Sequence, residues 1–279
     1  MKQDMIKLFK ITGLVVILLS LCLIYISPVF AQAVSITYGQ TVSGSIDASG
    51  EKDEFTFSGT STDKITVRFA ETSGSLNACA ELFNPSGTRI TYSTSGRLDS
   101  TLAATGTFKI VIRDYGNTAT GAYSLSLQLL NNPANATALT FGQTVSGTIG
   151  SFTQIKTYSF TVNANDTVTV RTAATQTTSG AFGPYIELYD STGTLVGYSS
   201  SGSLTKKITT AGKACLIITD YSRNGTGTYS LSLQRVNNPG SATALTFGQT
   251  VAGTIGSFTQ IKAYSFTVNA NDTVTVRTA

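Results

Sequence analysis

Carboxylates are the main candidates for catalytic or metal-binding side chains in this sequence, because its 279 residues include no histidine. Without histidine there is no Ser-His-Asp or Cys-His nucleophile, no imidazole base and no histidine-ligated metal. One short region is rich in acids, and calcium favours oxygen-rich loops of this kind. These candidate calcium ligands are Asp47, Glu51, Asp53 and Glu54. The alternative is a solvated hairpin edge whose charges block strand pairing, and Lys52 inside the cluster favours it.

Other carboxylates recur along the chain. Glu81 returns as Glu187 in a matching segment, and Asp114 returns as Asp220, each time before a tyrosine. A glycosidase needs two carboxylates at a set separation, but no further polar constellation recurs around these. We therefore expect buried or rim carboxylates bonded to tyrosine or backbone, and no enzyme activity. Three aspartates that precede Thr/Val-rich strands are expected to close turns: Asp63, Asp166 and Asp272.

Tyrosines are the remaining candidates for ligand contact. The chain has no tryptophan, so the strongest platform for stacking on sugars is absent. Tyr115 and Tyr221 lie in equivalent loops and are the candidate contacts to a sugar or a fibrous polymer. Tyr123 and Tyr229 alternate with small residues and are instead expected in the core.

The net charge of the chain limits the classes of partner that we expect it to bind. Lys and Arg total 19 against 15 Asp and Glu, a formal net charge of +4. Such a weak excess does not predict a surface that tracks phosphates, so we expect no nucleic-acid partner.

The N-terminal segment contains basic, apolar and small residues in that order. Lys2, Lys7 and Lys10 precede an apolar stretch at 11–26, and small residues follow around Ala31 and Ala33. Residues 1–31 are therefore predicted to be a signal peptide. The alternative is an uncleaved anchor, which would be the chain's sole contact with a membrane.

Export implies an oxidising compartment, where cysteines usually pair. Outside residues 1–31 the cysteines are Cys79 and Cys215, which fall at non-equivalent positions of different repeats. We expect buried or half-buried free thiols, with an interchain link as the alternative.

Internal repetition decides the domain organisation. The sequence Gly-Gln-Thr-Val stands at 39–42, 142–145 and 248–251, and later markers follow in the same order. The predicted domains are 33–131 and 137–237, followed by a truncated third repeat at 243–279, with short polar Pro-bearing linkers between them. The last repeat is too short to bury a core, so we expect residues 245–279 to be poorly ordered alone. We also expect the chain to be a fragment of a longer product, or to end in a degenerate copy.

Period-two alternation marks the strands. At 158–162 the sequence reads Tyr-Ser-Phe-Thr-Val, which places apolar side chains on one face and hydroxyls on the other. Frequent glycine turns separate such segments. This pattern predicts an all-β protein of tandem jelly-roll-like antiparallel β-sandwich domains after the signal peptide, with a small barrel as the alternative.

The order of the markers resembles the bacterial and archaeal pre-peptidase C-terminal (PPC) domain family, in tandem copies. The resemblance rests on Gly-Gln-Thr-Val-x-Gly, a Tyr/Phe-x-Phe strand, Thr-Val-Thr-Val, Glu-Leu-Tyr-Asp-x-x-Gly-Thr and Gly-Thr-Tyr-Ser-Leu-Ser-Leu. It implies a non-catalytic jelly-roll-like sandwich appended to secreted enzymes, often peptidases, and some such relatives bind calcium and an insoluble substrate. Two features depart from that setting. No peptidase domain is present, and the second repeat replaces the acidic cluster with Gly150, Gln154, Lys156 and Thr157.

These observations predict a non-catalytic secreted or cell-surface protein that acts in adhesion, polymer binding or spacing. Its expected partner is an extracellular protein or polysaccharide, or the cell envelope, held by the avidity of linked weak sites. The alternative is an accessory region of a secreted peptidase or other hydrolase. No cofactor is expected except calcium in the first repeat.

Overall fold

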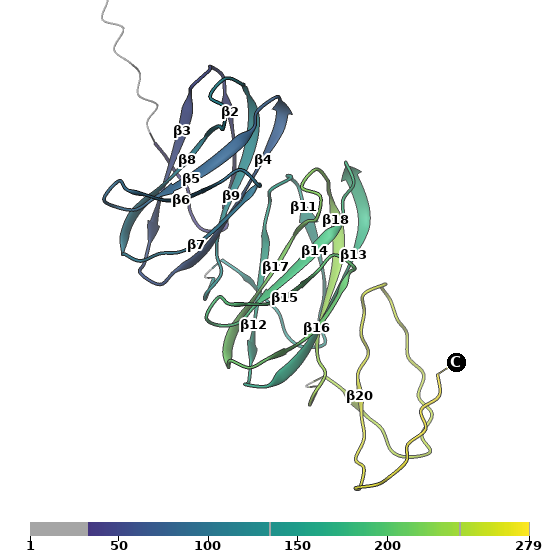
Figure 1. Ribbon diagram of the computed structural model, residues 1–279. Coiled ribbons are helices and arrows are strands. Elements are labelled where there is room, and N and C mark those ends of the chain that lie inside the picture. Colours follow the sequence, from purple (N-terminus) through teal and green to yellow (C-terminus); the bar gives the residue numbers. More distant parts are fainter. Residues whose placement is uncertain (1–32, 134, 240, 279) are drawn as a thin grey trace, which may run out of the picture. The chain divides into compact units, whose positions relative to one another are not determined.

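The computed structural model describes residues 33–133, 135–239 and 241–278 (Figure 1). Ala33–Ala279 form one compact unit. The predicted signal peptide lies outside the described residues. The part of the chain that the structure describes contains no helix with the length and hydrophobicity of a membrane span.

The first repeat consists of two sheets. The five-stranded sheet has the order β1-β3-β8-β5-β6, and the four-stranded sheet has the order β2-β9-β4-β7. All pairings are antiparallel except that of the short β1 with β3, which is parallel. The strands are β1 (Val34–Ser35), β2 (Thr41–Ile46), β3 (Lys52–Gly59), β4 (Lys64–Gly74), β5 (Ala78–Phe83), β6 (Arg89–Ser93), β7 (Arg97–Thr101), β8 (Gly106–Asp114) and β9 (Gly121–Leu129).

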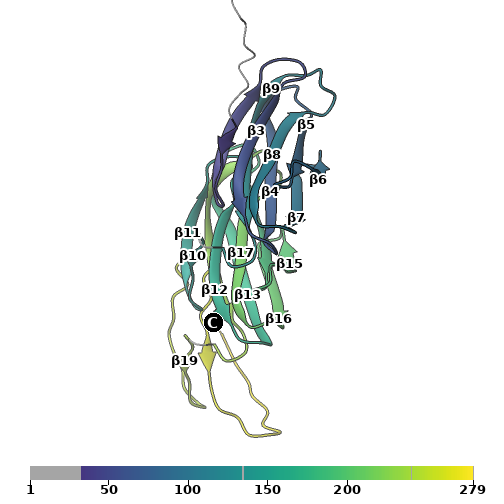
Figure 2. The same ribbon diagram turned by 90° about the vertical axis from the view of Figure 1, so that its left-hand side faces the viewer.

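The second repeat has the same strand order. Its sheets run β10-β12-β17-β14-β15 and β11-β18-β13-β16. Figure 2, turned by 90°, shows the five-stranded sheet of the first repeat more nearly face-on, with β3, β8, β5 and β6 following one another across the view. The strands are β10 (Thr137–Ala138), β11 (Thr144–Ile149), β12 (Lys156–Val162), β13 (Asp166–Ser179), β14 (Pro184–Tyr189), β15 (Leu195–Ser199), β16 (Ser203–Ile208), β17 (Gly212–Asp220) and β18 (Thr226–Arg235).

Each repeat closes its two sheets over one apolar core. In the first repeat Phe55 and Ile110 of one sheet share a buried cluster with Ile65 and Leu125 of the other. A second cluster of the same kind joins the two sheets of the second repeat. The prediction of all-β sandwich domains is confirmed, and the alternative of a small barrel is wrong because each repeat has two separate sheets.

Tyr123 and Tyr229 lie in the core, as predicted, and explain a glycine of the repeat. Both are fully buried, and a side chain on Gly44 would come within 2.4 Å of the Tyr123 hydroxyl. The glycine is therefore required where the tyrosine crosses the sheet. Tyr123 donates to Asp53 at 2.5 Å, whereas the Tyr229 hydroxyl lies 2.7 Å from that of Tyr158.

Local side-chain bonds close the turns. The carboxylates of Asp63, Asp166 and Asp272 each accept a hydrogen bond from the backbone N–H three residues earlier, at 2.9, 2.9 and 2.8 Å. The predicted turn role of these aspartates is confirmed. Gly87 and Gly193 end equivalent hairpin turns with φ of 81° and 73°, a region that favours glycine.

Both cysteines outside residues 1–31 are buried and free. Burial raises the pKa of the Cys79 thiol and raises that of Cys215 to about 12. Such thiols are poor nucleophiles at neutral pH, because the thiolate is the reactive form. The prediction of buried free thiols is confirmed.

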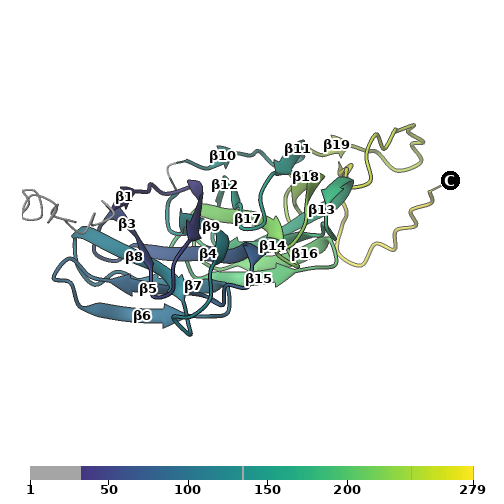
Figure 3. The ribbon, with the colours of Figure 1, turned by 90° about the horizontal axis from the view of Figure 1, so that it is seen from above.

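The segment after the second repeat contains little paired backbone. Its described strands are β19 (Thr243–Ala244) and β20 (Tyr264–Ser265), which pair in parallel as β1 and β3 do. Figure 3 shows most of this segment, in yellow, as coil. Large apolar side chains that are buried in complete repeats are exposed here, including Phe266 and Val276.

We expect backbone amides of residues 245–279 to exchange hydrogen rapidly, because few of their hydrogen bonds are sheltered by a core. Amides of β4 and β13 should exchange much more slowly, and hydrogen exchange read by mass spectrometry checks both. Equal protection in the segment and in those strands would contradict this expectation.

Candidate functional site

One face of β14 and β17 points away from the core of the second repeat. Ile186 and Leu188 point into the core, so the alternating residues Tyr185, Glu187 and Tyr189 lie on the opposite face. This outward face of the sheet is where the second repeat meets the first.

The first repeat meets it with two arginines. Arg68 on β4 and Arg97 on β7 are directly opposite each other in the antiparallel pair. Like charges at such positions repel. The carboxylate of Glu187 resolves the repulsion, because one of its oxygens accepts from Arg68 and the other from Arg97.

This ion pair is buried. Glu187 is 1% exposed and Arg68 is 7% exposed. Burial by itself would lower the pKa of Arg97, but the charge of Glu187 outweighs it and raises that pKa. Arg97 also donates to the Tyr189 hydroxyl at 3.0 Å. A buried charge is tolerated only when paired, so these contacts hold the repeats in one register.

Apolar and hydroxyl contacts complete the interface between the two repeats, which we call the joint. Leu130 of the first repeat is buried in a cluster with four residues of the second: Ile155, Tyr189, Cys215 and Ile217. Beside it, the Thr153 hydroxyl lies 2.6 Å from that of Ser124 and 3.3 Å from that of Ser126. We define the joint as these residues together with Arg68, Arg97 and Glu187.

A pocket of about 280 Å³ opens beside the joint. Tyr185 and Tyr221 form one wall, with ring centroids 5.7 Å apart, and Tyr198 lies 5.9 Å from Tyr185 on its other side. Tyr221 is 62% exposed. The pocket is lined by Arg68, Ser95, Arg97, Tyr185, Asp220, Tyr221 and Arg223.

Three arginines line this pocket, and two of them, Arg68 and Arg97, pair with Glu187. Arg97 pairs with Asp99 as well, Arg223 donates to the Ser95 carbonyl, and the carboxylate of Asp220 accepts from the backbone amides of Gly183, Asn224 and Gly225 at 2.9–3.0 Å. Burial, and then the charge of Arg68, lowers the pKa of Arg223. The Nε atom of Arg68 is buried and has no hydrogen-bond partner among the described residues. An anionic group beside the tyrosines would be attracted here.

Of the two tyrosines predicted to contact ligand, only Tyr221 lies in this pocket. Tyr115 is 49% exposed and has the guanidinium of Arg113 5.9 Å from its ring centroid. Pairing with β8 places Cys79 opposite Arg113, where the second repeat has Tyr185 opposite Thr219. Without a tyrosine at that position, the first repeat has no equivalent aromatic wall.

The acidic cluster is not gathered around a common point. Glu51 accepts from the backbone amides of Asp47 and Ala48 at 2.5 and 2.8 Å, and Glu54 pairs with Lys109 at 2.7 Å. Asp53 accepts from Tyr123, and burial raises its pKa. No group of three or more His, Cys, Asp or Glu in the described residues is arranged to hold a metal. Calcium binding by the cluster stays a prediction from sequence.

The recurring carboxylates divide into two kinds. Asp114 is buried, and hydrogen bonds from backbone amides, chiefly that of Thr118, lower its pKa. Asp220 is bonded in the same way, so the expectation of backbone partners is met for the aspartates. Glu81 instead pairs with arginines of its own repeat, and Glu187 with arginines of the other.

Sequence reasoning missed Arg68, Arg97 and Arg223. The sequence does contain a signal for Arg68, because Thr-Val-Arg recurs at 66–68, 169–171 and 275–277. A charged residue repeated on a strand of low overall charge indicates a structural partner. No repeat marks Arg97, whose equivalent in the second repeat is Ser203 opposite Arg171.

Comparison with known proteins gives similarity to solved structures, some over about one repeat of this chain and some over more. No family model matches the sequence, and no curated protein matches it either. The pre-peptidase C-terminal domain of collagenase from Bacillus anthracis is 20% identical, covering 35% of this chain and 95% of that chain with a TM-score of 0.30. A periplasmic inhibitor of g-type lysozyme, PliG from Aeromonas hydrophila, is 18% identical, covering 34% and 96% with a TM-score of 0.29. The secreted serine protease VesC from Vibrio cholerae is 8% identical, covering 73% and 49% with a TM-score of 0.27. Because these sequence identities and TM-scores are low, the fold assignment rests on the strand pairing described above.

Replacing Glu187 by glutamine should destabilise the joint, because the buried Arg68 and the half-buried Arg97 then face each other without a carboxylate between them. We expect E187Q to lower the free energy of unfolding by on the order of 3 kcal/mol. Chemical denaturation measures the loss, and E54Q, which removes an exposed ion pair, serves as the control. An E187Q loss no larger than that of E54Q would contradict a structural role for the pair.

Calcium should not stabilise the first repeat, because three of the four carboxylates of the acidic cluster, those of Glu51, Asp53 and Glu54, already have protein partners. We expect the same Tm in millimolar calcium and in a chelator, measured by differential scanning calorimetry. A rise in Tm with calcium that D47N abolishes would restore the cluster as a metal site.

Proposed function

We propose that the chain is a non-catalytic, exported protein of tandem β-sandwich modules that holds an acidic extracellular polysaccharide. The pocket beside the joint carries the proposal, because it combines tyrosine rings with Arg223, a guanidinium group that pairs with no carboxylate in the described residues. Tyrosine rings stack on the faces of sugar rings, and guanidinium groups pair with carboxylate or sulfate in a two-pronged geometry. The pocket thus has the chemistry of an acidic sugar site.

The size of the pocket favours one unit of a polymer over a free small molecule. Its volume of about 280 Å³ lies just below the usual range for ligand pockets, which begins at about 300 Å³. A single shallow site binds weakly, and a polymer that reaches several copies gains affinity through effective concentration. The mechanism is therefore adhesion by repeated weak contacts at fixed spacing.

The joint supports the spacing part of this function. Its buried ion pair and its apolar cluster resist bending between repeats, in the way that packed neighbours stabilise other repeat proteins. The basic and apolar N-terminal segment supports export, and the free thiols are sheltered by burial.

An accessory role beside a secreted hydrolase is the second candidate. The order of sequence markers that resembles the PPC family supports it, and the pocket would then hold the substrate polymer for a separate catalytic domain. Both candidates place the same residues in contact with polymer and assign no catalysis to this chain.

Affinity electrophoresis in gels that contain polygalacturonate tests the binding. We expect the chain to be retarded, and retardation to weaken with added salt because the contact is partly ionic. A neutral dextran gel is the matched comparison. Equal mobility in polygalacturonate and in dextran would contradict the proposal.

Tyr221→Ala should weaken binding to polygalacturonate by roughly tenfold, because it removes an aromatic wall of the pocket. Tyr115→Ala is the matched control, since Tyr115 is the equivalent tyrosine of the first repeat and lies outside the pocket. Equal losses for the two variants would place the contact elsewhere.

A further inference from the structure

The pocket beside the joint is shared between the two repeats. Its walls include Arg68, Ser95 and Arg97 of the first repeat and Tyr185, Tyr221 and Arg223 of the second. Each repeat supplies at least one arginine, and the second supplies both tyrosine rings. The pocket therefore exists only while the repeats are docked at the joint, and a ligand that fills it contacts both of them.

Arg223 is the residue of the second repeat that reaches across to the first. It lies in the loop after β17, and its guanidinium group donates to the backbone carbonyl of Ser95, in the turn between β6 and β7. A side chain on Gly96 of that turn would collide with this guanidinium group. The equivalent loop position of the first repeat holds Asn117, with the same left-handed backbone conformation. The arginine is therefore specific to the second repeat, where it contacts the first.

Arg68 of the first repeat presents a second cation to the same pocket. Burial, and after it the charge of Arg68, lowers the pKa of Arg223, so the two guanidinium groups repel each other. Arg68 pairs with Glu187, but its Nε atom is buried and has no hydrogen-bond partner within the described ranges. Arg223 pairs with no carboxylate of those ranges. An anion that enters between the two arginines would relieve repulsion across the joint.

The acids that line or border the pocket are already engaged. Asp220 accepts from three backbone amides of the second repeat at 2.9–3.0 Å. Glu187 accepts from Arg68 with one oxygen and from Arg97 with the other. Glu187 thus shows how one carboxylate of one repeat can hold cations of the other. A carboxylate supplied by a ligand suits the place between Arg68 and Arg223 for the same reason.

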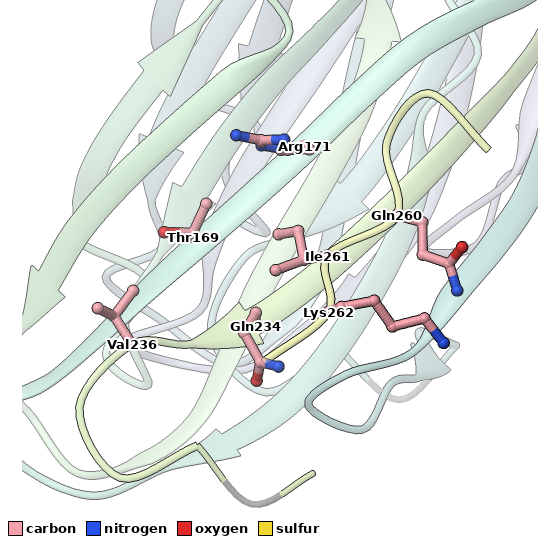
Figure 4. Close-up of a pocket in the computed structure, with 7 residues that line it drawn as sticks. All are labelled: Thr169, Arg171, Gln234, Val236, Gln260, Ile261 and Lys262. Carbon is pink, nitrogen blue, oxygen red and sulfur yellow. The ribbon is translucent and has the colours of Figure 1, made fainter. Parts of the chain in front are cut away.

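A second pocket shows that an arginine on this kind of sheet does not make such a site by itself. This pocket, of about 340 Å³, lies on the second repeat. Figure 4 shows Arg171, the counterpart of Arg68, on one side of it and Ile261 near its centre. Among the described residues, no aromatic side chain and no other arginine lines it. Tyrosine rings and a facing arginine come together in the pocket beside the joint.

We propose that one carboxylate of the ligand binds between Arg68 and Arg223 and bridges the repeats, so that occupation of the pocket and closure of the joint stabilise each other. This inference rests on the proposed function, which supplies the class of ligand, an acidic sugar stacked on Tyr221. The coupling is reciprocal, because a ligand that favours the closed joint must bind that state more tightly. A chain with a loosened joint then binds the polymer less well, even where its pocket residues are intact.

Glu187→Gln separates this coupling from simple charge attraction. The variant removes a negative charge beside Arg68 and Arg97, so a pocket of fixed shape would bind an anion more tightly. If the joint must be closed for binding, the same variant weakens binding, because the pocket opens with the joint. The two accounts predict opposite signs for one measured affinity.

Leu130→Ala loosens the joint without changing any charge. Leu130 is 4% exposed in the apolar cluster of the joint and does not line the pocket. Val236→Ala is the matched control, because Val236 is the counterpart of Leu130 in the second repeat and is 55% exposed. Arg223→Ala removes one side of the bridge itself.

Isothermal titration calorimetry of the full chain with polygalacturonate is the test. We expect E187Q and L130A each to weaken binding by about fivefold or more, R223A to weaken it by roughly tenfold, and V236A to leave it unchanged. In the natural chain, polygalacturonate should also slow amide hydrogen exchange at residues 150–155, which dock at the joint, whereas neutral dextran should not.

No binding by the natural chain would contradict the proposed function and the bridge together. The bridge alone is overturned, with the proposed function left standing, if the natural chain binds and E187Q strengthens that binding. It is overturned in the same way if L130A or R223A leaves binding unchanged, if V236A weakens it as much as L130A does, or if residues 150–155 gain no protection. The exchange measurement needs no variant and decides the matter if E187Q does not fold.

Discussion

The buried carboxylate of Glu187 is the constraint on which the arrangement of this molecule depends. It lies between two arginines that face each other across β4 and β7, and neither repeat alone could keep these charges out of water at low cost. The first repeat supplies the cations and the second supplies the anion. The apolar cluster around Leu130 and the hydroxyl contacts of Thr153 then form around a register that the ion pair has set.

The same geometry creates the candidate binding site. Tyr185 stands two residues before Glu187 on β14, so the strand that buries the carboxylate also brings a tyrosine to the rim of the joint. Tyr221 and Arg223 follow β17 and complete the pocket from the second repeat, with Arg68, Ser95 and Arg97 on the side of the first. In the proposed function, ligand binding and fixed spacing are therefore two consequences of one contact.

Much of the fold could be predicted from local sequence, because alternation and glycine turns act over a few residues. The core position of Tyr123 and the turn role of Asp63 belong to this class. The site could be predicted only in part. Tyr221 was found from its equivalence to Tyr115, but the arginines were not, since Arg68 and Glu187 are 119 residues apart and lie in different repeats. Periodicity within one strand carries no information about a partner at that separation.

A direct measurement of the joint is the tumbling of the two repeats in solution. Nitrogen-15 relaxation of the natural chain gives a rotational correlation time for residues 33–129 and another for residues 137–235. A joint held by Glu187 predicts that both sets of amides tumble as one body, with a single correlation time set by the whole. Two distinct and shorter correlation times would show independent motion and would contradict the structural role assigned to the ion pair.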